Sequence, residues 1–87
     1  MAEILATTGA ITTASRLAGE LEKLGCLNVR VVHTPAEIAS GGCSYSVSLP
    51  EENLSLLRSL MHNKRLKIRR ILRLTTKNGE REFDDIS

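Results

Sequence analysis

Aromatic residues are almost absent from this chain. Its 87 residues include one Tyr, one Phe and no Trp. A core must therefore be built from Leu, Ile, Val and Ala. The chain also lacks a run of roughly 18 consecutive apolar residues, which a membrane helix needs, and a basic start followed by an apolar stretch. We expect a cytoplasmic protein.

Cysteine and histidine are also scarce. The two cysteines, Cys26 and Cys43, are too few for a disulfide scaffold, and with His33 and His62 they do not form the spacing of a four-ligand zinc site. We expect no metal and no cofactor. No serine lies in a nucleophile elbow with a positioned base, which argues against a serine hydrolase.

The net charge of +2 hides an uneven distribution along the chain. Residues 64–73 hold six basic residues and no acid, whereas residues 80–85 hold four acids and one Arg. The length and composition predict one domain over residues 1–76, followed by a flexible acidic tail over residues 77–87. The six basic residues are Lys64, Arg65, Lys67, Arg69, Arg70 and Arg73.

The spacing of apolar residues predicts four strands and two helices. Spacing of three and four indicates a helix from Ile11 to Gly25, and Pro50 suits the first position of a second helix that runs to about Asn63. Alternation or β-branched residues indicate strands over residues 3–8, 28–33, 43–49 and 66–74.

The resulting order, β-α-β-β-α-β, predicts an α+β fold of the ferredoxin-like split βαβ type. Two helices would pack on one face of a four-stranded antiparallel sheet, in the strand order four, one, three, two. Cys43 would then lie near Thr8, Gly9 and the start of the first helix. Cys26 would lie about a strand length away, roughly 20 Å, so we expect no disulfide between the two cysteines.

Cys43 is the main candidate for chemistry. A thiolate is the nucleophilic form of cysteine, and helix amino termini favour it; the neighbouring Gly41 and Gly42 could add backbone amides. The alternative is that Cys43 is a small buried residue at the start of a strand. His33 could act as a base or be a half-exposed strand end, and Glu37 could orient an amide or be a solvated carboxylate. For Cys26, we expect core packing.

The segment around Cys43 resembles a family of small bacterial proteins of unknown function that are described as Se/S carrier-like. Its members have a short strand, an Ala- and Leu-rich helix, and a strand that ends in a pair such as Thr-Pro. An acidic and an aliphatic residue, small residues and a cysteine follow. The general layout agrees from about Ile4 to Leu74. The matching residues are Thr34, Pro35, Glu37, Ile38, Ser40 and Cys43.

The resemblance implies a carrier or thiol accessory protein rather than an enzyme. Cys43 would accept sulfur or selenium from a donor enzyme as a persulfide or selenopersulfide and pass it to an acceptor protein. The basic residues 64–73 would dock an acidic donor. The residues expected around the thiol are Thr8, Gly9, His33, Pro35, Glu37, Ser40, Gly41 and Gly42.

Two other interpretations stay open. An exposed edge strand over residues 29–32 could pair with a copy of itself or with another chain, which would make the protein an interaction module or a homodimer. The basic strand could contact nucleic-acid phosphates, although the central strands offer only Tyr45 for stacking, and basic residues on an edge strand also prevent sheet-to-sheet association.

Overall fold

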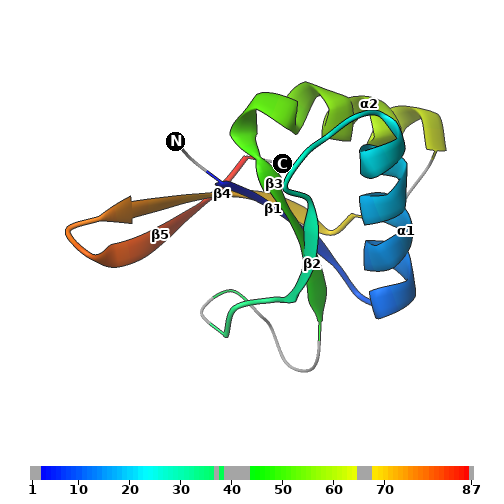
Figure 1. Cartoon of the computed structure of the whole chain (residues 1–87). Coiled ribbons are helices and arrows are strands. Elements are labelled where there is room, and N and C mark those ends of the chain that lie inside the picture. The colour runs from blue at the N-terminus through cyan, green and yellow to red at the C-terminus, as the bar shows by residue number, and fades with distance from the viewer. Residues whose placement is uncertain (1–2, 37, 39–43, 65–67, 87) are drawn as a thin grey trace.

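The computed structural model describes residues 3–36, 38, 44–64 and 68–86. Its centre is an antiparallel five-stranded sheet in the order β2-β3-β1-β4-β5, and both helices cover one face of it (Figure 1). The predicted α+β class is confirmed. The elements are β1 (Glu3–Thr8), α1 (Ile11–Lys23), β2 (Arg30–His33), β3 (Tyr45–Pro50), η1 (Glu51–Asn53, a 3-10 turn), α2 (Leu54–Lys64), β4 (Arg70–Lys77) and β5 (Glu80–Asp85).

The hydrophobic core lies between the sheet and the helices. In β1, Ile4 and Ala6 point to the helices, where Leu17 and Leu21 of α1 and Leu57 of α2 meet them; all five are fully buried. Each fully buried Leu contributes about 1.5 to 3 kcal/mol relative to an exposed one. The aliphatic core that the lack of aromatic residues demands is therefore a continuous layer under both helices.

Helix α1 ends in a glycine cap that the sequence predicts. Gly25 adopts φ +89°, a left-handed conformation that costs glycine little because it has no Cβ. The amides of Gly25 and Cys26 then donate to the carbonyls of Glu22 and Leu21, at 3.0 and 3.1 Å. This pair of bonds is a Schellman motif, and it turns the chain towards β2.

The second helix begins later than predicted. Pro50 has extended backbone angles, φ −64° and ψ 146°, and ends β3 instead of opening a helix. The turn η1 follows, and the α-helix starts at Leu54. Glu51 of η1 pairs with Arg73 of β4, with 2.5 Å between Oε1 and Nε, so the turn is held against the sheet. None of the described helices is long and apolar enough to span a membrane.

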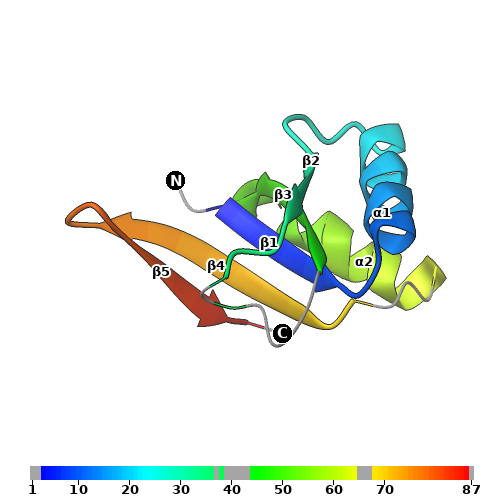
Figure 2. The same ribbon diagram turned by 90° about the horizontal axis from the view of Figure 1, so that it is seen from below.

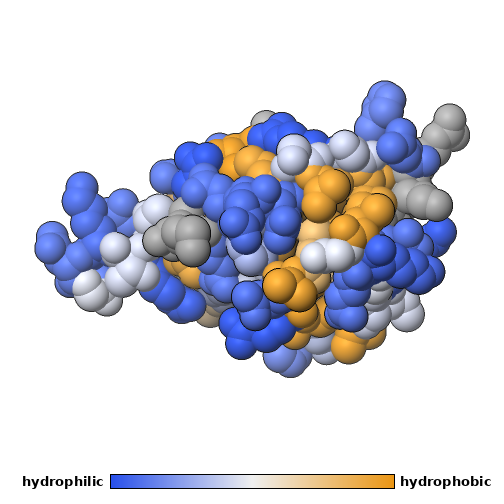
Figure 3. Space-filling model, turned by 45° about the horizontal axis from the view of Figure 1, so that its top comes forward, coloured by the Kyte–Doolittle hydropathy of each residue, from blue (hydrophilic) through white to orange (hydrophobic). Residues whose placement is uncertain are grey.

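The prediction of four strands is wrong by one strand. The first four strands neighbour one another in the expected order, but β5 lies beyond β4, within the residues expected to form a flexible tail. Asn78 and Gly79, with φ 54° and 80°, make the two-residue turn that returns the chain. The hairpin projects beyond the rest of the sheet (Figure 2), and hydrophilic residues cover it (Figure 3).

The added strand also changes the place of the basic segment. The sequence prediction put this strand at the edge of the sheet, but β4 pairs with β1 on one side and with β5 on the other. It therefore lies inside the sheet, and its basic side chains cannot protect an edge. β4 starts at Arg70; residues 66 and 67 of the predicted strand lie outside the described part.

Candidate functional site

The start of β3 meets the chain that enters α1. Thr8, the last residue of β1, lies opposite Tyr45, the first residue of β3. The Thr8 side chain is fully buried, and its Oγ1 donates to the carbonyl of Tyr45 at 2.9 Å and to that of Ala10 at 3.1 Å. The sequence predicted that the segment leading into β3 comes close to Thr8 and Gly9. The described residues bring Thr8 together with Tyr45; Cys43 itself lies outside them.

The amino end of α1 carries uncompensated positive character. Its N-cap residue, Ala10, makes no side-chain hydrogen bond, and no acidic residue lies in the first turn. The Arg69 guanidinium lies against Gly9, where an added Cβ would come within 2.8 Å of Nη2. Gly9, Ala10, Thr13, Ile68 and Arg69 line an open cleft of about 380 Å³ here. The helix dipole and the arginine charge both favour an anion at this end of the sheet.

His33 lies at the same end of the sheet. It is the last residue of β2 and lies opposite Tyr45, with ring centroids 4.7 Å apart and a 36° angle between the ring planes. The imidazole is exposed to solvent. The structure thus brings Thr8 and His33 to the two sides of Tyr45, which the sequence interpretation named only as a stacking candidate. Its place opposite both strands follows from register, which local spacing does not reveal.

The connection between β2 and β3 is anchored at both of its ends and at one interior point. The Thr34 amide donates to the Ser44 carbonyl at 3.0 Å, which closes the base of the connection. After Pro35, the Ile38 amide donates back to the Pro35 carbonyl at 3.0 Å, which forms a tight turn. Glu37, Ser40, Gly41, Gly42 and Cys43 belong to the predicted site but lie outside the described residues.

Among the basic residues proposed for docking, the described arginines Arg69, Arg70 and Arg73 contact three different parts of the protein. Arg73 pairs with Glu51, and the Arg70 side chain donates to the Ile38 carbonyl on the opposite face of the sheet. Arg69 lies against Gly9 at the amino end of α1. Lys64 is the last residue of α2, while Arg65 and Lys67 lie outside the described residues. Each described arginine therefore faces a different part of the protein itself.

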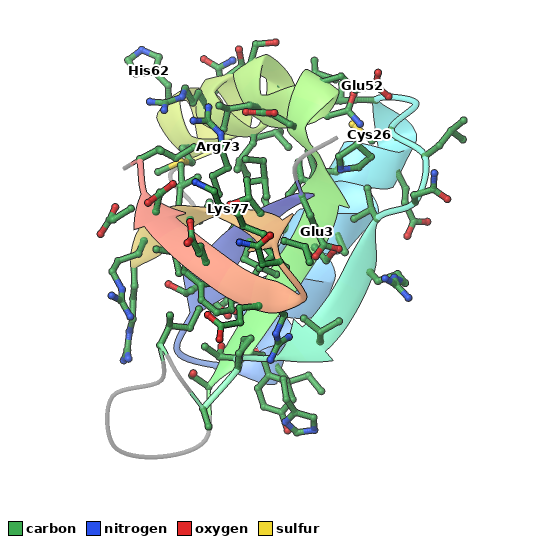
Figure 4. All side chains as sticks on the ribbon, turned by 90° about the vertical axis from the view of Figure 1, so that its left-hand side faces the viewer. Glu3, Cys26, Glu52, His62, Arg73 and Lys77 are labelled. Atoms are coloured by element: carbon green, nitrogen blue, oxygen red, sulfur yellow. The ribbon has the colours of Figure 1, made fainter. Side chains whose placement is uncertain are left out.

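Cys26 is a core residue, as the sequence predicts. Only 6% of it is exposed, its thiol is free, and burial raises its pKa. It follows the end of α1 and lies at the end of the molecule opposite to that where β2 ends (Figure 4). A buried thiol with a raised pKa is a poor nucleophile, because the thiolate is disfavoured.

Comparison with known protein families now adds to this geometry. Residues 3–73 match the family described as "Putative Se/S carrier protein-like". The chain belongs to this family. The match covers β1 to the first half of β4, and hence the Thr8–Tyr45 contact and the connection between β2 and β3, but it ends before the β4–β5 turn. No curated protein matches the chain.

Proposed function

We propose that this member of the Se/S carrier-like family holds sulfur or selenium on Cys43. The Cys43 thiolate attacks the outer sulfur of a donor cysteine persulfide, the donor S–S bond breaks, and the donor leaves as a thiolate. Cys43 then carries a persulfide. A nucleophile of the acceptor attacks the outer sulfur and releases the Cys43 thiolate, so no external oxidant or reductant is needed. Selenium transfer follows the same steps through a selenopersulfide.

The single observation that carries this proposal is the pairing of Thr8 with Tyr45. Cys43 stands two residues before Tyr45 in the sequence, and Tyr45 is hydrogen-bonded to the residue that leads into α1. Two residues of chain span at most about 7 Å, and this short separation from Tyr45 supports a position of the thiol near the amino end of that helix. The family match over residues 3–73 supports a carrier of these elements.

Arg69 adds a second source of positive charge to the proposed site. Its guanidinium lies against Gly9, directly before α1. Persulfide transfer passes through thiolate and persulfide anions, and both are stabilised by a nearby cation and by free helix amides. In the structure Arg69 faces the amino end of α1, so we assign it to the thiol site instead of a docking surface.

Sulfur loading tests the proposal directly. The protein is incubated with a low-molecular-weight persulfide, digested, and its cysteine peptides are examined by mass spectrometry. The expected result is one added sulfur atom on the Cys43 peptide and none on the Cys26 peptide, and Cys43→Ser abolishes the gain. Loss of the added sulfur to an acceptor thiol completes the test. An unmodified Cys43 peptide, under conditions that load a control thiol, rejects the carrier function.

A second candidate is pairing through the outer strand β2. β2 is an outer strand of the sheet, and Val31 and Val32 are only partly buried. An outer strand has backbone groups available for another strand, so two copies could join there. Sedimentation equilibrium tests this function: a dimer that Val31→Pro converts to a monomer supports it, and a monomer at all concentrations excludes it.

A further inference from the structure

Arg70 joins β4 to the connection between β2 and β3, although neither β2 nor β3 is a neighbour of β4 in the sheet. Its backbone amide donates to Thr7 Oγ1 at 2.9 Å, and its side-chain Nη2 donates to the carbonyl of Ile38 at 2.5 Å. The next residue, Ile71, belongs to the core beneath the helices. Because successive residues of a strand point to opposite faces, the Arg70 side chain lies on the face without helices.

The contact with Ile38 shows where this residue of the β2–β3 connection lies relative to the sheet. β2 and β3 are at one side of the sheet, and β1 separates β3 from β4. Strands are about 4.8 Å apart, so β4 lies roughly 10 Å from β3 across the sheet. A connection that simply projected beyond the ends of β2 and β3 could not reach Arg70. At Ile38, the chain therefore lies back across the helix-free face.

Burial along one row of residues agrees with this path. Ser46 of β3, Thr7 of β1 and Arg70 of β4 lie opposite one another in register, on the helix-free face. Ser46 is fully buried and Thr7 is 4% exposed, although no helix covers them. Thr34 contributes to the cover, with 2.7 Å between its Oγ1 and the Ser46 hydroxyl. The connection thus starts across this row at Thr34 and reaches its far end at Arg70.

We infer that Arg70 is a positioning residue that holds the β2–β3 connection across the helix-free face of the sheet. The inference rests on the proposed function in one respect: Cys43 belongs to the same connection in the sequence, so loss of the Arg70 contact is expected to change the reactivity of the carrier thiol. Without the guanidinium, the described contacts of Thr34 with Ser44 and Ser46 still close the base of the connection. The turn at Ile38 loses its tie to β4.

Hydrogen exchange of the Ile38 amide tests the positioning role. The Ile38 amide donates to the Pro35 carbonyl, and the Ile38 carbonyl accepts from Arg70. Arg70→Ala removes this hydrogen bond from a charged donor, so the turn at Ile38 is expected to open more often and its amide to exchange about tenfold faster or more. Arg58→Ala is the matched control, since Arg58 also donates from Nη2 to a main-chain carbonyl, that of Ile86. The control leaves the Ile38 rate unchanged. Equal Ile38 rates in the wild type and in Arg70→Ala overturn the inference.

Two further measurements separate positioning from general stability. The Arg69 amide, which donates to Thr7 O at 2.8 Å, reports whether the sheet stays intact in each variant. If Arg70→Ala does not fold, Arg70→Lys, which keeps one donor, gives the same comparison with a smaller expected change. Faster exchange at Ile38 with unchanged exchange at Arg69 supports positioning; equal acceleration at both amides refutes it.

The thiol chemistry then shows whether positioning matters for the carrier. The pH profile of Cys43 alkylation is measured in the wild type, Arg70→Ala and Arg58→Ala, with the Cys26 peptide quantified separately. A profile displaced only in Arg70→Ala supports the link between Arg70 and the thiol, and identical profiles refute that link. Sulfur loading of the wild type is a separate readout, so failure of the carrier function is distinguishable from failure of the Arg70 contact.

Discussion

Thr8 is the residue that joins β1, β3 and α1. Its buried hydroxyl lies within hydrogen-bond distance of the carbonyls of Tyr45 and Ala10, so one side chain links β3 to the chain that enters α1. A buried acceptor that loses its donor cannot turn to water, which makes such a contact more important than its single hydrogen bond suggests. Thr8 therefore fixes the distance between the strand that follows Cys43 and the amino end of α1.

Replacing Thr8 by the isosteric Val tests this assignment. We expect Thr8→Val to lower the free energy of unfolding by about 1 to 3 kcal/mol, because the buried hydrogen bond to the Tyr45 carbonyl is lost while the volume is kept. Urea denaturation measures the change. The control is Thr12→Val in the first turn of α1, where the side chain is exposed. A cost for Thr12→Val equal to that for Thr8→Val would contradict the assignment.

Cys26 gives the stability a defined pH dependence. Burial raises its pKa, so the folded state binds the thiol proton more tightly than the unfolded state does. The neutral thiol makes its full contribution to the free energy of unfolding below the pKa of an unfolded thiol, about 8.5. This contribution is lost as the pH rises through the raised pKa of the folded state. Between about pH 8 and 10, we expect the free energy of unfolding to fall more steeply in the wild type than in Cys26→Ala. Parallel curves would show that Cys26 does not titrate with unfolding.

At the scale of the elements, the periodicity of the sequence predicted the first four strands and both helices. It did not predict β5, which is defined by its pairing with β4. The bounds of β1 and the alternation of residue types in β3 agree with the structure: Val47 and Leu49 belong to the core, and Ser46 between them does not. β5 was missed because its six residues include one apolar side chain, Phe83. The signal that could have found it is the pair Asn78-Gly79, a typical two-residue hairpin turn.

Only the part of the candidate site that depends on the order of the strands could be predicted from the sequence. The prediction that β3 starts beside Thr8 follows from the order of the elements. The contact between Arg70 and Ile38 joins residues 32 apart in the sequence, and no local spacing indicates it. Both Ile71 and Leu72 are buried although they point to opposite faces of β4, so alternation alone could not identify the face that meets the helices.

Substitution by Ala is expected to have opposite effects on stability at two glycines, Gly79 in the β4–β5 turn and Gly19 in α1. Gly79→Ala places a Cβ at φ 80°, and we expect the free energy of unfolding to fall by about 1 to 2 kcal/mol. Gly19 lies inside α1 with no atom within 4 Å of an added Cβ, so Gly19→Ala is expected to raise it by about 0.5 to 1 kcal/mol. Thermal unfolding followed by circular dichroism measures both. A neutral Gly79→Ala would mean that the β4–β5 hairpin does not contribute to global stability.

At the scale of the whole molecule, one aliphatic layer holds the two helices on the sheet. α1 contacts β1, β2, β3 and α2, and in the described part of the chain the large apolar side chains that are fully buried in this core are Leu, Ile or Val. A domain of this size has a total stability of only about 5 to 15 kcal/mol. The free-energy cost of a single cavity in this layer is therefore a large fraction of the total stability.

Truncation of Leu17 tests this dependence. We expect Leu17→Ala, at a fully buried position of α1, to lower the free energy of unfolding by about 2 to 5 kcal/mol. Leu27→Ala is the matched control, since 76% of Leu27 is exposed, and its expected effect is within about 0.5 kcal/mol. Guanidinium denaturation gives both values. Similar effects at the two positions would show that burial does not decide the contribution of leucine here.

The central place of β1 has consequences during synthesis. β1 is synthesised before its partners β3 and β4, which follow roughly 40 and 65 residues later, at about 5 to 20 residues per second. For several seconds the apolar stretch Ile4–Ala6 has no strand on one or both of its sides. A nascent chain therefore keeps this apolar segment without both of its neighbouring strands until β4 has been synthesised.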